Sequence, residues 1–292
     1  MKENKSFSRV GLSYTVYMVM VWLLVRSATE LLLLFGGSLA EDTVYKVYYI
    51  AVAAVQYGIC LLLMFLMLRR RDGFKLPRNN LSVGGFIMAA CIICGFMLVG
   101  SMFGSFVNGI ISELFGVEQP TVAEILSGYN SPIILFMDAA IIAPVAEEFI
   151  FRKLIIDRLY PSGKTEAILV SALMFGAAHG NFEQFFYAVG IGIVFAYIYA
   201  NTGKLRYSVF LHFVINLIGV LQIVLNEELV QRLTFAWGTA VILLGIAGIV
   251  CIIGERRKLR FLKSVSLRKI FLNFGMITAV LLSIAMFVCE YI

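Results

Sequence analysis

The sequence predicts an all-α fold, a polytopic membrane helical bundle of about eight or nine transmembrane helices with a cytoplasm-facing intramembrane cavity. Hydrophobic residues make up 61% of the chain and charged residues only 14%, whereas a soluble domain carries about 25% charged residues. Apolar runs of about 20 residues, the length that crosses a bilayer, recur from end to end. Because no long polar segment separates them, residues 1–292 are predicted to form a single polytopic membrane domain.

The apolar runs define the predicted helices in order. The first follows three basic residues, as a signal peptide would, but it is too long for one and is interrupted by Arg26 and Glu30. We therefore expect a retained helix in which these two residues, four positions apart, form an ion pair. The fifth run is short, and all boundaries are approximate. The predicted spans are 10–38, 47–68, 83–111, 131–152, 165–180, 182–200, 205–225, 233–253 and 270–290.

Basic residues fall almost entirely in alternate connections between these spans. They precede the first span and follow the second, fourth, sixth and eighth, while the other connections carry mostly Asp and Glu. By the positive-inside rule this pattern places the N-terminus in the cytoplasm. The net charge of +6 then reflects topology and anionic lipid, and no nucleic acid partner is expected. Short connections and the absence of an organellar signal favour the plasma membrane of a prokaryote.

Small residues form a stripe in the third span. Gly100 and Gly104 are four positions apart, with serine and asparagine nearby, which suits close packing against another helix. Gly190 and Gly192 in the sixth span suggest the same role.

Two adjacent glutamates lie inside the fourth span. A charged side chain near the bilayer centre costs about 2.5–3.5 kcal/mol on insertion scales, so residues retained there are expected to be functional. Successive helical residues point about 100° apart, so Glu147 and Glu148 face different ways. Glu148 lies four positions before Arg152 and can pair with it, which predicts a supporting role for both. Glu147 has no cation on its own face and is the candidate general base or acid.

The only two histidines of the chain also lie in apolar spans. His179 ends the fifth span, and His212 and Asn216, four positions apart, project from one face of the seventh. At 1.5 Å per residue, His212 lies about 10 Å from the cytoplasmic end of its span, and the depths of the other groups overlap with it. We therefore expect Glu147, His179, His212 and Asn216 to share one pocket that opens to the cytoplasm.

These side chains suit hydrolysis by an activated water molecule. Glu147 with His179 can polarise the water, and His212 with Asn216 can donate hydrogen bonds to an oxyanion. No Ser or Cys stands at a helix turn beside an obvious base, which argues against a covalent nucleophile.

One alternative is a zinc ion held by Glu147, His179 and His212, although the HExxH spacing is absent. A second is that the polar groups only bridge helices. No cofactor is favoured.

The three motifs together resemble a known family. Glu147-Glu148-x-x-x-Arg152, Phe175-x-x-x-His179 and His212-x-x-x-Asn216, in this order, are similar to the CAAX protease and bacteriocin-processing family, also called CPBP or Abi, which includes the type II CAAX prenyl endopeptidases. The resemblance covers about residues 130–220. It implies that Glu147 and His179 activate the water, that His212 and Asn216 form the oxyanion site, and that Glu148 and Arg152 support the architecture. Lys153 departs from the family, which usually has Gly there, and the last two spans lie outside the resemblance.

The resemblance implies a CAAX prenyl protease-like intramembrane endopeptidase, a hydrolase acting on peptide bonds. Its expected substrate is a membrane-associated peptide or protein, such as a CAAX-like tail, a peptide pheromone or a bacteriocin-related peptide. The alternative is a non-proteolytic membrane regulator or immunity protein that binds a partner membrane protein, but a pure scaffold need not keep the four polar residues. A proton-coupled transporter would predict inverted repeats, and the sequence shows none.

Overall fold

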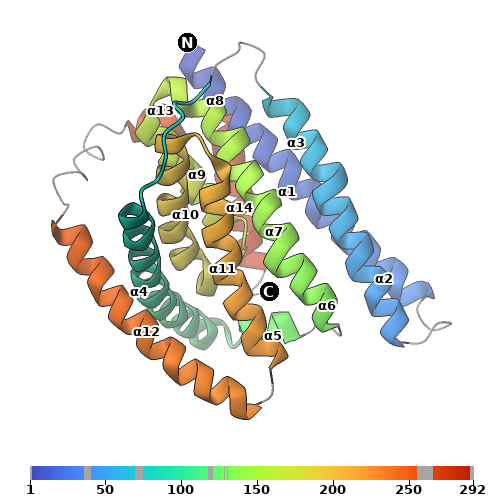
Figure 1. Ribbon diagram of the computed structural model, residues 1–292. Coiled ribbons are helices and arrows are strands. Elements are labelled where there is room, and N and C mark those ends of the chain that lie inside the picture. Colours follow the sequence, from blue (N-terminus) through green and yellow to red (C-terminus); the bar gives the residue numbers. More distant parts are fainter. Residues whose placement is uncertain are drawn as a thin grey trace.

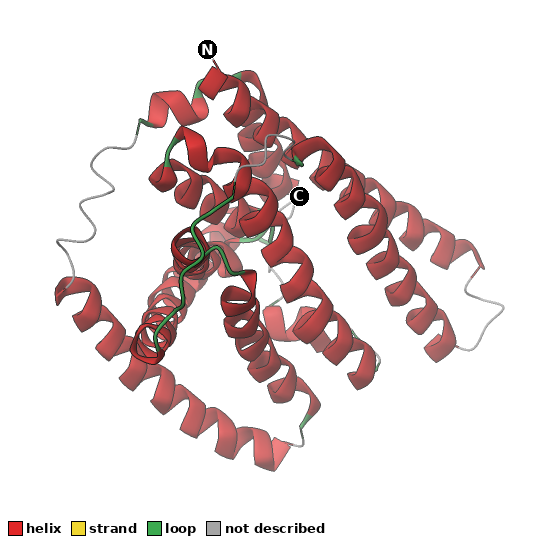
Figure 2. Ribbon diagram, turned by 45° about the horizontal axis from the view of Figure 1, so that its top comes forward, coloured by secondary structure: helices red, strands yellow, loops and turns green. Residues whose placement is uncertain are grey.

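The computed structural model of the chain is helical throughout the parts it describes, which are residues 2–35, 41–69, 75–117, 121–127, 129, 131–225, 227–254 and 266–289. No strand occurs in these ranges, and Figure 2 shows helices joined by short loops. The prediction of an all-α fold is confirmed.

In the labels below, η2, η3 and η4 are π-helical and η5 is a 3₁₀ turn. The elements are α1 (Lys2–Phe35), α2 (Glu41–Ala54), η2 (Val55–Cys60), α3 (Leu61–Leu68), α4 (Val83–Phe115), α5 (Val122–Ser127), α6 (Pro132–Leu135), η3 (Phe136–Ile142), α7 (Ala143–Glu148), η4 (Phe149–Ile156), α8 (Asp157–Leu159), η5 (Tyr160–Ser162), α9 (Lys164–Ala177), α10 (Phe182–Thr202), α11 (Leu205–Val224), α12 (Glu227–Gly254), α13 (Leu267–Phe271) and α14 (Phe274–Cys289).

Five helical segments of the described residues are long and apolar enough to cross a membrane. They match the first, second, third, sixth and seventh predicted spans, except that residues 36–38 of the first lie outside the described parts. The other four predicted spans also fall on helices, but α9 has 14 residues, α14 has 16, and the fourth span is divided among α and π segments. The chain is a helical membrane protein, and the number of nine spans stays a prediction. The five segments are Lys5–Leu31, Lys46–Leu68, Val83–Phe115, Phe182–Thr202 and Leu205–Val224.

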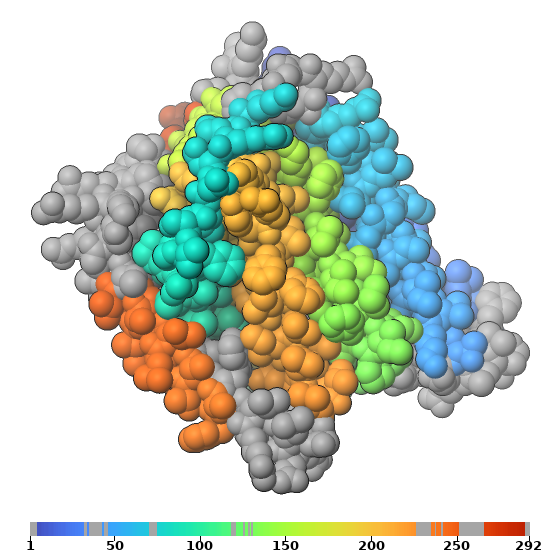
Figure 3. Space-filling view, viewed as in Figure 1, coloured from blue at the N-terminus to red at the C-terminus, as the bar shows by residue number. Residues whose placement is uncertain are grey.

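The helices that carry the predicted polar residues lie in the middle of the bundle. Figure 1 shows α6 to α11 between α1 to α3 on one side and α4 with α12 on the other. On the face seen in Figure 3, α11 runs between α4 and the α6–α7 helix. Behind it, α9 and α10 form an antiparallel pair that packs against α4 and η4. This arrangement surrounds the polar side chains with apolar helices.

Basic residues of the described connections lie at one end of the bundle, the upper end in Figure 1. Hydrogen bonds join them there: Lys164 Nζ donates to Asn201 Oδ1 at 2.6 Å, and Lys269 Nζ donates to the carbonyl of Ser162 at 2.7 Å. Among the described connections, the alternation of charge along the sequence therefore does separate the two ends of the bundle. Which end faces the cytoplasm stays a prediction.

Glycines bring α4 and α10 into close contact. A Cβ atom added to Gly100 would lie 2.5 Å from the Cα of Tyr187, and one added to Gly104 would lie 2.6 Å from the carbonyl oxygen of Phe182. A Cβ atom added to Gly190 of α10 would in turn lie 2.4 Å from the ring of Phe96 in α4. Only glycine fits such approaches, so the predicted packing role of these small residues is confirmed.

Candidate active site

The two glutamates lie on a helix that contains two π-helical segments. α7, which ends at Glu148, is flanked by η3 and η4. Such π turns are frequent at functional sites because they shift the backbone register locally. Pro144 lies inside this continuous helix, three residues before Glu147, and lacks the N–H that would bond to the preceding turn. The side chain of Glu147 is 26% exposed, whereas that of Glu148 is fully buried.

Glu148 and Arg152 form a fully buried ion pair. Arg152 Nε donates to Glu148 Oε2 at 3.0 Å, and neither side chain is exposed. Nη1 of Arg152 donates to Ser171 Oγ at 3.1 Å, and the guanidinium group lies 4.6 Å from the ring centroid of Phe175. A buried charge needs such a partner and such hydrogen bonds to be tolerated. The predicted pairing is confirmed, whereas Ser171 was not predicted.

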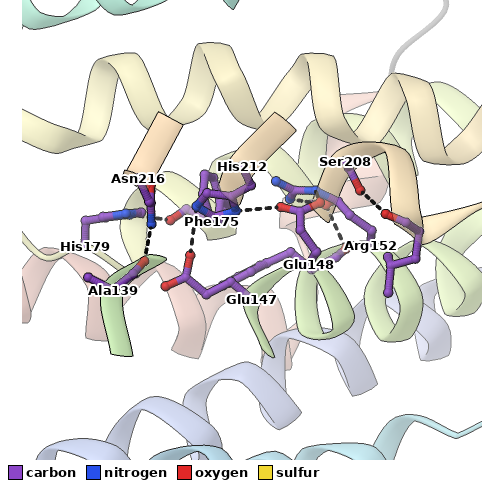
Figure 4. Close-up of polar contacts among 12 residues, drawn as sticks. Ala139, Glu147, Glu148, Arg152, Phe175, His179, Ser208, His212 and Asn216 are labelled. Atoms are coloured by element: carbon purple, nitrogen blue, oxygen red, sulfur yellow. Dashed lines mark hydrogen bonds and ion pairs between the residues drawn. The ribbon is translucent and has the colours of Figure 1, made fainter. Parts of the chain in front are cut away.

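His212 lies between the two glutamates (Figure 4). Its Nδ1 is 3.3 Å from Glu148 Oε1, and its Nε2 is 3.7 Å from Glu147 Oε2. Because Glu148 is held as an ionised acceptor by Arg152, Nδ1 must be the donor in the first contact. The sequence suggested that Glu147 works with His179. In the structure the histidine next to Glu147 is His212, which links the two carboxylates.

His179 and Asn216 are each fixed by a backbone carbonyl. Nδ1 of His179 lies 2.9 Å from the carbonyl oxygen of Phe175, and a carbonyl only accepts, so Nδ1 carries a proton. In the tautomer with this single ring proton, Nε2 is an acceptor. Nδ2 of Asn216 donates to the carbonyl of Ala139 at 2.8 Å, which leaves its second amide hydrogen available. Both side chains line the same cavity as Glu147.

A cavity of about 340 Å³ joins the predicted catalytic side chains, a volume within the usual range of ligand pockets. Glu147, His179, His212 and Asn216 all line it, although they come from two helices, α7 and α11, and from the turn after α9. Figure 4 shows these side chains converging on one region of the bundle. The structure therefore brings the four residues together, as the sequence suggested, and their catalytic roles stay a prediction. A larger apolar cavity of about 490 Å³, between α9, α10 and α14, contains none of them.

The cavity extends away from the basic end of the bundle. Along α11 its wall runs from His212 to Gln222, and Val122 and Tyr129, in the connection between α4 and α6, complete it. The sequence suggested a cavity facing the basic, cytoplasmic end. On that side the buried Glu148–Arg152 pair and the aromatic rings around it fill the space. The depth of a residue in its span does not reveal toward which end of the bundle the cavity beside that residue extends.

One polar pair of the cavity was missed in the sequence. The hydroxyl of Tyr129 donates to Asp138 Oδ2 at 2.7 Å, and both residues line the cavity. Asp138 is a carboxylate inside the predicted fourth span, so the insertion-cost argument that singled out Glu147 applies to it equally. Tyr129 carries no comparable signal because a loop brings it to the site.

The side chains do not fit the zinc alternative. A catalytic zinc ion needs three protein ligands directed at one point. Among the residues that the structure describes, no group of three or more His, Cys, Asp or Glu side chains is placed to hold a metal ion. Glu147 and His212 approach each other, but His179 does not join them in such a group.

Comparison with known proteins agrees with the geometry. Residues 129–218 match the family model described as type II CAAX prenyl endopeptidase Rce1-like. The "Putative membrane peptidase YdiL" of Bacillus subtilis (strain 168) is 28% identical over 176 residues, which cover 56% of this chain and 68% of that protein. The "Membrane-embedded CAAX protease MroQ" of Staphylococcus aureus (strain USA300) is 29% identical over 152 residues, which cover 49% of this chain and 61% of that protein.

The matches are partial. The chain spans about two thirds of the first relative and less than two thirds of the second, and no solved structure matches it. The matched segment, residues 129–218, contains both glutamates, both histidines, Arg152 and Asn216. The resemblance drawn from the three motifs is therefore confirmed: over residues 129–218 this membrane protein is similar to the Rce1-like type II CAAX prenyl endopeptidases.

Proposed function

We propose that this protein is an intramembrane endopeptidase that hydrolyses a peptide bond in a membrane-associated peptide or protein. The observation that carries the proposal is the convergence of Glu147, His179, His212 and Asn216 on one cavity inside an apolar bundle. The names of the two relatives, a membrane peptidase and a CAAX protease, support the same class of reaction. A CAAX-like tail, a peptide pheromone or a bacteriocin-related peptide is the proposed substrate.

Each side chain has a role in this mechanism. Glu147 accepts a proton from water while the water oxygen attacks the carbonyl carbon of the scissile bond, and the C–N bond breaks as that proton passes to the leaving nitrogen. Nε2 of His179 accepts the second hydrogen of the water and so orients it. The remaining amide hydrogen of Asn216 donates to the developing oxyanion. His212 adds a second donor when both of its ring nitrogens carry a proton, with Nδ1 donating to Glu148 and Nε2 to the oxyanion.

Replacement of the proposed base tests this assignment. We expect Glu147→Gln to lower the rate of cleavage by at least about 100-fold, because the variant keeps the shape of the side chain but cannot accept the proton. Membrane peptides of cells that produce the wild type, Glu147→Gln or no protein would be compared by mass spectrometry. Glu113→Gln is the matched control, since Glu113 is an exposed carboxylate on α4 that does not line the cavity.

The outcomes separate the proposal from its alternative. Peptides that appear with the wild type and Glu113→Gln but not with Glu147→Gln would support proteolysis. A regulator or immunity protein that acts by binding would keep its cellular effect in Glu147→Gln and leave the peptide set unchanged. That second result would overturn the proposal.

Chelation tests whether Glu147 or a zinc ion activates the water. With Glu147 as the base, purified protein is expected to keep its activity after exhaustive treatment with strong chelators. A zinc enzyme loses its metal and its activity under the same treatment. Activity that returned only after zinc was added back would reject the proposed mechanism but not the peptidase assignment.

A further inference from the structure

The cavity contains a second carboxylate that the proposed mechanism does not use. Asp138 stands in η3, and its Oδ2 accepts a hydrogen bond from Tyr129. Its Oδ1 is buried and has no hydrogen-bond partner among the described residues. A carboxylate that is enclosed and only half satisfied costs free energy unless another donor reaches it. Oδ1 of Asp138 can therefore accept a hydrogen bond from a donor group outside the described protein.

The charges around the cavity are of one sign. Among the described residues, Asp138 and Glu147 are the only Asp or Glu side chains that line it, and no Lys or Arg does. Basic residues lie instead at the opposite end of the bundle. Tyr57 and Tyr129 line the cavity as well, and the faces of aromatic rings attract cations. The missing donor is thus expected to be positively charged.

The spacing along the helix places this carboxylate at a defined distance from the reaction. Nine positions separate Asp138 from Glu147, which corresponds to about 13 Å along a helix. An extended peptide covers about 3.3 Å per residue, so about four substrate residues bridge the two carboxylates. A substrate peptide that lies along the cavity with its scissile bond at Glu147 would bring one side chain to Asp138.

We propose that Asp138 is a specificity residue that binds a basic side chain, Lys or Arg, of the peptide substrate about four residues from the scissile bond. The juxtaposition that carries this inference is a half-satisfied carboxylate and an acidic, tyrosine-lined wall in the same cavity as the proposed base. The inference rests on the proposed peptidase function and names the class of substrate. It also explains why a carboxylate is kept at this depth in an apolar bundle.

A structural role for Asp138 makes a different prediction. Its bond to Tyr129 ties the connection before α6 to the helix that carries Glu147, and loss of that bond would disturb the site for every substrate. Asp138→Asn removes the charge but keeps an oxygen that accepts from Tyr129. The ratio of rates for two peptides that differ only in charge therefore isolates specificity from structure.

The experiment uses full-length protein in proteoliposomes and a set of palmitoylated 12-residue peptides. In each peptide one position carries either Lys or norleucine, which has a similar length but no charge. Cleavage products are identified by mass spectrometry for the wild type, Asp138→Asn and the control Glu113→Gln. Binding of the same peptides is measured on the Glu147→Gln protein with and without Asp138→Asn, so that recognition is observed separately from cleavage.

For the wild type and Glu113→Gln we expect Lys to be preferred over norleucine at a single position, about four residues from the cleaved bond. A preference of about tenfold in kcat/KM would correspond to 1.4 kcal/mol. In Asp138→Asn this ratio should fall to about one, and Lys-dependent binding should be lost in the double variant.

A wild type without the preference, or equal slowing of both peptides in Asp138→Asn, would overturn the inference. Peptides that bind through Asp138 but are not cleaved by the wild type would instead reject the peptidase function, and peptides that are neither bound nor cleaved would reject both.

Discussion

Arg152 and Glu148 each carry a charge that the apolar bundle could not hold alone. Both side chains are fully buried, and the guanidinium group has contacts with Glu148, Ser171 and aromatic rings. Lys153 and Asp157 form a second pair on the same helix, with the same spacing, but the lysine side chain is 49% exposed. The two pairs therefore offer a matched comparison of buried and exposed charge.

We expect Glu148→Ala and Arg152→Ala each to lower the free energy of unfolding by about 3–5 kcal/mol, because each leaves a buried charge without its partner. Lys153→Ala should cost at most about 1 kcal/mol, since the lysine is exposed to solvent and Asp157 keeps its hydrogen bond from Tyr199. Thermal unfolding in detergent and the yield of membrane-inserted protein measure the difference. Variants of Glu148 and Arg152 with wild-type stability but no activity would show that these residues act in the chemistry.

Pairs that are local in sequence could be predicted at this scale, and pairs formed by tertiary contact could not. Glu148 with Arg152 and Arg26 with Glu30, at 3.8 Å, follow from the four-residue spacing of a helix and are confirmed. The position of His212 between the two glutamates depends on how α11 approaches α7. No spacing within either helix contains that information.

Helix α4 shows what the sequence reveals about whole elements. Its glycines indicated a close neighbour, and the structure identifies that neighbour as α10, whose Tyr187 also lines the cavity. The existence of the helices could be predicted from apolar runs alone. The π-helical turns on either side of α7 could not, because their backbone register is decided by tertiary packing and has no residue signature.

Two glycines of α4 provide a test of this packing. Gly100→Ala is expected to destabilise the protein by about 1–3 kcal/mol and to lower activity, since its Cβ would meet the backbone of Tyr187 at 2.5 Å. Gly109 has nothing within 4 Å of the corresponding position, so Gly109→Ala should be neutral or stabilise the helix by up to about 1 kcal/mol. Melting temperatures and cleavage rates of the two variants give the comparison. Equal effects would mean that α4 and α10 do not approach this closely in the membrane.

On the scale of the whole molecule, charge divides the bundle into two ends while the cavity extends toward the less basic one. The described basic connections meet at one end, whereas the cavity wall reaches α5 at the other. The first property could be read from the sequence because charge alternates along the chain. The second could not, since it depends on where the buried Glu148–Arg152 pair and its aromatic neighbours leave space.

These two properties together predict the side from which the substrate enters. With the N-terminus in the cytoplasm, as the positive-inside rule requires, Gln222 at the far end of the cavity faces the outside and Tyr207 the cytoplasm. In a background without the five native cysteines, a membrane-impermeant maleimide should label Gln222→Cys in intact cells and Tyr207→Cys only in inverted vesicles. Detergent-solubilised protein, in which both positions should react, is the control. The reverse pattern would place the cavity, and with it the substrate, on the cytoplasmic side and would show that the basic end faces outward.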